Sequence, residues 1–151
     1  MNRPEMLLHL VEKLAAETNR FLDVKGPGRG NKATNSFILE LRKRAEDVFG
    51  DDFSEQQICG KNGLCVDYYF RDEATVVEIA FGLKKPGTEF EKDVLKAVIA
   101  NDSGNRVTQL IFICKPGGYN KCQQPGRKAV IEWAHKYHGI RISVCDIKQK
   151  R

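Results

Sequence analysis

The sequence predicts an α/β fold, in the α+β form of one mixed β-sheet covered by helices, as a single domain over residues 1–151. The length suits one sizeable core better than two domains. Hydrophobic periodicity changes along the chain in the order α, α, β, β, β, α, β, α, β. Three closely spaced strands indicate an antiparallel meander, whereas the later alternation of strands and helices indicates β-α-β crossovers.

The chain is expected to begin with a helix. Residues 4–22 carry apolar side chains at helical spacing, and Pro4 stands where the first turn of a helix tolerates proline. We therefore assign segment 1–24 to an N-terminal helix that stands apart from the core.

A basic, glycine-rich loop is predicted at 25–35, where the chain reads KGPGRGNK over its first eight residues. Lys25, Arg29 and Lys32 are candidates for contacts with nucleic-acid phosphates, because such a loop can approach a phosphate backbone closely. A plain linker is the alternative interpretation.

The remaining segment, 36–147, is expected to form the core. It opens with a helix near 36–49, followed by strands near 55–59, 64–70 and 75–81. Next comes a helix from 88 to 101, where Thr88 and Glu91 predict a capping box.

An almost unbroken apolar run at 107–114 predicts a strand buried on both faces. The polar run KPGGYNKCQQPG then predicts a loop. The last helix, 125–137, precedes a final strand near 139–147. That helix is expected to turn five side chains inward: Ala129, Val130, Trp133, Ala134 and Tyr137.

Composition narrows the class of protein. The net charge of +5 favours a polyanionic partner such as nucleic acid, although three of the positive charges belong to the terminal KQKR. The five cysteines are odd in number, which predicts reduced thiols. No apolar run reaches the length of a membrane span, so we expect a cytoplasmic protein that does not enter a membrane.

The predicted hairpin brings two acidic residues together. If 64–70 and 75–81 pair around a short turn at Asp72 and Glu73, paired residues have numbers that add up to 145, and Asp67 lies opposite Glu78. Two adjacent carboxylates repel each other unless they hold a proton or a cation, and Mg²⁺ prefers such oxygen ligands. The alternative interpretation is an ordinary solvated pair.

The element order and this acidic pair resemble the PD-(D/E)xK nuclease family, which has the restriction-endonuclease-like fold. The run EIAFG, followed by FEKDVLKA, further resembles the BglII-like restriction enzymes. The resemblance implies that Asp67 and Glu78 bind Mg²⁺, for which Mn²⁺ can substitute, and Glu40 matches the position of a further acid on the preceding helix.

One position departs from the family pattern. The family's lysine stands two residues after the second acid, where this chain has Ala80. We therefore consider Lys84, Lys85 and Lys92 as lysines that could reach the site from another direction. Apart from that role, Lys92 and Lys96 are predicted to form an exposed basic helix edge that contacts nucleic acid.

The resemblance implies an Mg²⁺-dependent DNA endonuclease that hydrolyses phosphodiester bonds. Because the core uses most of the chain, target recognition would require a homodimer or a partner subunit. Two alternatives remain open: a catalytically inactive nucleic-acid-binding or assembly subunit with the same fold, and a double-stranded-RNA-binding-like module over residues 36–101.

Overall fold

The computed structural model divides into two compact units. The first is Met1–Asp52 with Ile147–Arg151, and the second is Phe53–Asp146. The structure describes four stretches, without the side chains of 29–31: 1–18, 20–23, 29–83 and 87–148. The prediction of a single domain stays a prediction.

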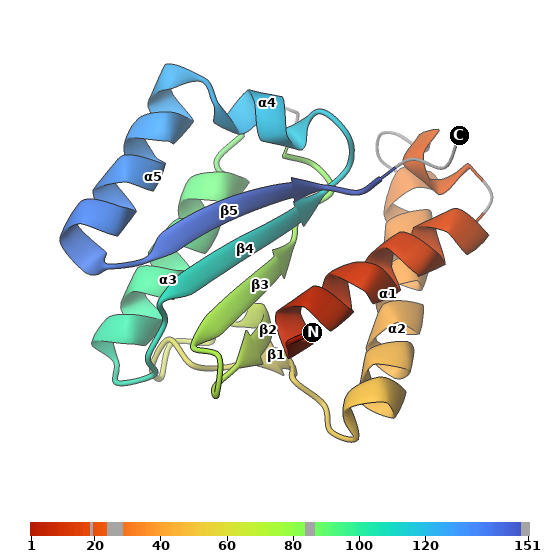
Figure 1. Cartoon of the computed structure of the whole chain (residues 1–151), viewed down its shortest axis with the longest axis horizontal. Coiled ribbons are helices and arrows are strands. Elements are labelled where there is room, and N and C mark those ends of the chain that lie inside the picture. The colour runs from red at the N-terminus through yellow and green to blue at the C-terminus, as the bar shows by residue number, and fades with distance from the viewer. Residues whose placement is uncertain (19, 24–28, 84–86, 149–151) are drawn as a thin grey trace. The chain divides into compact units, whose positions relative to one another are not determined.

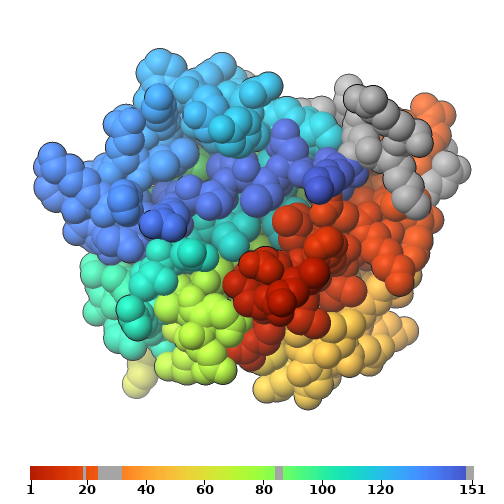
Figure 2. Space-filling view, viewed as in Figure 1, coloured from red at the N-terminus to blue at the C-terminus, as the bar shows by residue number. Residues whose placement is uncertain are grey.

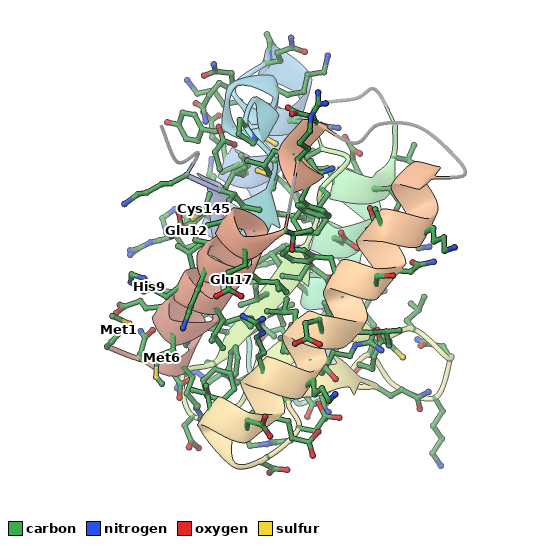
Figure 3. The ribbon with its side chains drawn as sticks, turned by 90° about the vertical axis from the view of Figure 1, so that its right-hand side faces the viewer. Met1, Met6, His9, Glu12, Glu17 and Cys145 are labelled. Atoms are coloured by element: carbon green, nitrogen blue, oxygen red, sulfur yellow. The ribbon has the colours of Figure 1, made fainter. Side chains whose placement is uncertain are left out.

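The first unit is a pair of helices, α1 (Arg3–Glu17) and α2 (Arg29–Phe49), with a short 3-10 helix η1 (Phe21–Asp23) after α1. The rings of Phe21 and Phe37 stack with their centroids 4.2 Å apart. Arg44 Nη1 on α2 lies 2.7 Å from Glu17 Oε2 on α1, and Figure 3 labels Glu17. An apolar stack and an ion pair therefore connect the elements of this unit.

Helix α2 begins at Arg29, so the predicted loop at 25–35 is wrong from that residue onward. The apolar spacing that defines the helix continues upstream of Ser36 through Ala33, which lies four residues before the buried Phe37. A glycine in a first turn costs a helix only about 1 kcal/mol, so Gly30 does not prevent this extension. Residues 24–28, and with them Lys25, lie outside the described part of the chain.

The second unit is an α+β unit built on one five-stranded mixed sheet in the order β1-β2-β3-β4-β5 (Figure 1). β1–β2 and β2–β3 are antiparallel, as predicted for the meander, whereas β3–β4 and β4–β5 are parallel. The mixed-sheet prediction is thus confirmed. The strand bounds are β1 Ser54–Gln56, β2 Val66–Phe70, β3 Thr75–Ile79, β4 Gln109–Cys114 and β5 Arg141–Asp146.

Two crossover helices, α3 (Glu89–Asp102) and α5 (Pro125–His138), lie side by side against one face of this sheet (Figure 1). Their apolar side chains join those of the strands in one core, in which the rings of Phe90 on α3 and Phe112 on β4 lie 5.0 Å apart. The core therefore fixes α3 above the carboxyl end of β3. This placement positions the site described below.

Helix α5 is rotated relative to the prediction. Trp133 and Tyr137 are exposed rather than inward, and Ala129 is exposed as well. Arg127 occupies an inward position instead: it is buried, donates a hydrogen bond to the Leu83 carbonyl, and lies over the Phe90 ring at 5.4 Å. A stripe chosen by apolarity alone misses a buried arginine whose stem packs like an apolar side chain. In Figure 2, α5 and β5 reach the face turned toward the viewer.

Two local predictions in the second unit are also wrong. Thr88 precedes α3 without a side-chain capping bond, so the capping box does not form. The segment after β4, expected to be loop, contains a short helix, α4 (Gly118–Cys122). The carboxylate of Asp146 accepts hydrogen bonds from the N–H groups of Gly117 and Tyr119, which stabilises this turn against β5.

The α4 turn supports a stability prediction. A Cβ added at Gly118 would overlap the side chain of Cys114 at the end of β4, whereas one added at Gly126 meets nothing within 4 Å. We expect Gly118→Ala to lower the free energy of unfolding by about 1–3 kcal/mol, because overpacking forces the backbone to move. Gly126→Ala, the control, lies in the first turn of α5 and should leave the free energy of unfolding unchanged or raise it by up to about 1 kcal/mol. Urea unfolding followed by circular dichroism measures both, and equal effects would contradict this explanation.

All five cysteines are free thiols, and three of them, Cys59, Cys114 and Cys122, are buried. Among the described helices, none is long and apolar enough to cross a membrane.

Candidate active site

The hairpin of β2 and β3 has the predicted register. Tyr68 pairs with Val77, Tyr69 with Val76 and Phe70 with Thr75, so every pair adds up to 145. The hairpin closes through a turn in which the Ala74 N–H bonds the Arg71 carbonyl at 3.0 Å. The next pair beyond the ladder is Asp67 and Glu78, and the register prediction is therefore confirmed.

The two carboxylates continue the hairpin where its backbone ladder ends. Asp67 Oδ2 accepts a 2.7 Å hydrogen bond from the Ile79 N–H, and Glu78 Oε2 accepts a longer one, 3.4 Å, from the Asp67 N–H. Each carboxylate thus reaches across to the other strand and uses one oxygen for a backbone donor. Glu78 is only 2% exposed, so the alternative interpretation of a solvated pair is wrong.

Helix α3 brings a lysine to this pair. Lys96 Nζ lies 2.8 Å from the Cys65 carbonyl oxygen, 3.0 Å from Asp93 Oδ1 and 3.3 Å from Glu78 Oε1. Its side chain is only 11% exposed. The prediction that Lys96 belongs to an exposed basic edge is therefore wrong, because the face of α3 that packs on the sheet carries Lys96 beside the buried Asp93.

These groups line one cavity of about 330 Å³ beneath the start of α3. Four carboxyl groups, those of Asp67, Glu78, Glu89 and Asp93, meet the single ammonium of Lys96 among the described lining residues. The segment from Ile79 to Leu83, including Ala80, forms another wall. The cavity is thus acidic, and Lys96 is the basic group among its described lining residues.

Two acids of the cavity, Glu78 and Asp93, have raised pKa values. Burial raises the pKa of Glu78 to about 10, and the nearby charges of Asp67 and Asp93 act in the same direction, whereas Lys96 opposes them. Burial also raises the pKa of Asp93 to about 6, against the pull of Lys96. Burial alone would lower the pKa of Lys96, but Glu78 and Asp93 outweigh it and raise the pKa. The ammonium therefore stays charged, while Glu78 holds a proton at neutral pH.

A hard cation is the other means of relieving this repulsion, and the donor set fits one. In the part of the chain that the structure describes, Glu78 Oε1 is buried without an aligned hydrogen bond, although Lys96 approaches it as a charge. Asp67 and Glu78 offer hard oxygen ligands of the kind that Mg²⁺ combines with several waters. The same described residues contain no group of three or more His, Cys, Asp or Glu side chains arranged around a metal position.

The other predicted site residues are not among the described residues that line this cavity. Lys92 is exposed on α3, while Lys84 and Lys85 lie outside the described residues. Glu40 belongs to the first unit, where its carboxylate pairs with Arg44 Nε at 3.1 Å. Its role as a third ligand stays a prediction.

The predicted phosphate contacts in the basic segment also stay predictions. Lys32 is exposed on α2, Arg29 begins that helix, and Lys25 lies outside the described residues.

Three residues of the cavity were not predicted to belong to the active site. They are Glu89, Asp93 and Lys96, of which Lys96 was predicted only as part of an exposed basic helix edge. A signal for them does exist, because they follow one another at i, i+4 and i+7, which places them along one face of α3. The sequence does not show how this helix is rotated about its axis, because apolar residues lie on both sides of the stripe.

Comparisons of the chain with protein-family models, curated proteins and solved structures found no match.

Proposed function

We propose that this chain is a Mg²⁺-dependent DNA endonuclease with the restriction-endonuclease-like fold, and that the cavity beneath α3 is its active site. One observation carries the proposal: Asp67, Glu78 and Lys96 meet in one cavity at the edge of the β2–β3 hairpin. Two acids and a lysine are the groups that the resemblance to PD-(D/E)xK nucleases requires. The lysine comes from α3 instead of position 80.

The sheet supports this assignment. An antiparallel hairpin that carries the acids, followed by a parallel crossover through α3, agrees with the core order of that family. A double-stranded-RNA-binding-like module over 36–101 explains less, because β4 and β5 continue the same sheet and have no place in a helix, three strands and a helix.

Each group has a distinct role. Asp67 and Glu78 would hold Mg²⁺ or Mn²⁺, and the bound cation would supply positive charge to the phosphate oxygens and make water a better nucleophile. Lys96 would donate a hydrogen bond to the phosphate or to the attacking water, beside Glu78. Asp93 is a positioning residue, because its carboxylate holds the Lys96 ammonium at 3.0 Å.

The first test is cleavage of plasmid and single-stranded DNA by the wild-type chain with Mg²⁺, Mn²⁺ or EDTA. We expect nicking with either cation and none with EDTA. DNA binding without cleavage under both cations would favour the alternative, an inactive nucleic-acid-binding or assembly subunit that retains the fold. If the wild-type chain neither binds nor cleaves DNA, both the endonuclease and the nucleic-acid-binding subunit are contradicted.

Lys96 and Lys92 form a matched pair for a second test, because both are lysines of α3 and only Lys96 reaches the cavity. Lys96→Ala should slow cleavage on the order of 10²-fold, since it removes the one ammonium of the described lining residues. Lys92→Ala should at most weaken DNA binding and flatten its salt dependence. Single-turnover rates and binding isotherms separate the two effects. A larger rate loss for Lys92→Ala than for Lys96→Ala would contradict the assignment of the lysine.

A further inference from the structure

The Lys96 ammonium is already surrounded by acceptor oxygens of the protein, with no substrate bound. An ammonium has three N–H donors. Three acceptors surround this one: the Cys65 carbonyl oxygen, Asp93 Oδ1 and Glu78 Oε1. With burial of nearly nine-tenths of the side chain, the lysine is part of the packed site rather than a mobile surface group.

The three contacts are unequal. Those to Cys65 and Asp93, at 2.8 Å and 3.0 Å, are hydrogen-bond distances for a charged donor. The contact to Glu78 is longer, 3.3 Å, and no aligned hydrogen bond reaches that oxygen from the described residues. Lys96 can therefore give up Glu78 while it keeps its two stronger contacts.

The two stronger contacts come from structure that surrounds the site. Asp93 lies one turn earlier on α3, and the Cys65 carbonyl stands two residues before Asp67 on the β2 side. The Cys59 thiol also donates to the Lys96 carbonyl at 3.3 Å, which connects the loop before β2 to α3. These contacts would keep the ammonium at the cavity after its release from Glu78.

We propose that the Lys96 ammonium blocks Oε1 of Glu78 in the metal-free protein and must leave this oxygen before a divalent cation can bind between Glu78 and Asp67. This inference rests on the proposed function, because it assumes that the acidic pair is a metal site. Lys96 thereby sets the affinity for the metal, in addition to its role in cleavage.

The physical reason is competition for one oxygen. An ammonium 3.3 Å from Glu78 Oε1 occupies the space of a ligand and repels a second positive charge in a site of low dielectric. Asp93 favours the release of Lys96 from Glu78, because its carboxylate still balances the positive charge of the ammonium once Glu78 binds the metal. Removal of Lys96 should therefore strengthen metal binding although it weakens catalysis, and these opposite signs distinguish a lysine that blocks the metal site from a merely structural lysine.

The test measures Mn²⁺ affinity without DNA, by isothermal titration calorimetry and by the electron paramagnetic resonance signal of free Mn²⁺. Lys96→Met, which keeps the length of the side chain, should bind Mn²⁺ at least roughly tenfold more tightly than wild type. Lys96→Gln, which can still donate to the Cys65 carbonyl, should do the same if Lys96→Met folds poorly. Lys92→Met removes the same charge from the exposed side of α3 and should change the affinity less than threefold or so.

A double-mutant cycle tests the part assigned to Asp93. Asp93→Asn should weaken Mn²⁺ binding in the wild-type background, and the loss should shrink in the Lys96→Met background, where no ammonium needs compensation. Glu89→Gln, which removes another acid of the same cavity, should show equal losses in both backgrounds. If Asp93→Asn lowers the Mn²⁺ affinity equally in both backgrounds, Asp93 does not act by compensating the charge of Lys96.

The outcomes separate the two proposals. If wild type binds Mn²⁺, Asp67→Asn abolishes binding and Lys96→Met binds no more tightly than wild type, the inference about Lys96 fails and the proposed function stands. If neither wild type nor the Lys96 variants bind Mn²⁺ at millimolar concentration, the metal site itself is wrong and both proposals fall.

Discussion

Asp67→Asn is expected to reduce DNA cleavage on the order of 10³-fold or more while leaving DNA affinity equal or higher. The amide oxygen of asparagine can still accept the Ile79 N–H that Asp67 Oδ2 accepts at 2.7 Å, so the hairpin should keep its form. The lost negative charge would weaken the hold on the metal and reduce repulsion of the phosphates. Activity and binding should therefore respond in opposite directions, which plasmid-nicking rates and fluorescence anisotropy measure.

Asp72→Asn is the matched control for this substitution. Asp72 lies at the exposed turn of the same hairpin, and its replacement removes the same charge outside the cavity. Its cleavage rate should stay close to that of wild type. If both variants lose activity equally, or if Asp67→Asn cleaves at the wild-type rate, Asp67 is not a ligand of a catalytic metal.

Glu78→Gln is expected to stabilise the metal-free protein by about 2–3 kcal/mol at pH 7. The folded protein raises the pKa of Glu78 from 4.5 to about 10, so it binds the proton that the unfolded chain releases. The contribution of Glu78 to the free energy of unfolding should therefore be most favourable below pH 4.5. It should fall as the pH rises toward 10. A glutamine does not ionise, so the variant should lack this part of the slope.

Urea unfolding from pH 5 to 9, in EDTA, checks the sign. Glu132→Gln, at an exposed position of α5, removes an equal charge and should leave the wild-type slope in place. Added Mg²⁺ should raise the stability of wild type and much less that of Glu78→Gln, since a ligand stabilises only the form that binds it. A variant less stable than wild type at pH 7, with an unchanged slope, would mean that Glu78 is ionised in the metal-free site.

The hairpin could be predicted because its determinants are local. Two short strands around a four-residue turn leave few registers, and the pairing of Tyr69 with Val76 extends directly to Asp67 and Glu78. Apart from the short helix α4, the order of strands and helices in the second unit was equally predictable, because each of these elements has its own apolar period. The rotation of a helix about its axis is a different matter, as the exposure of Trp133 and Tyr137 demonstrates.

By itself the sequence determined the mixed sheet, its antiparallel meander and the opposition of two carboxylates across one hairpin. Only the tertiary structure decided that Glu78 is buried and that Lys96, eighteen residues further along the chain, closes the site. The reason is that strand pairing alternates with a period of two and fixes which side chains meet, whereas the inward face of α3 depends on packing against strands far away in the chain. Phe90 packs on Phe112 of β4, and that contact turns Asp93 and Lys96 toward the acids.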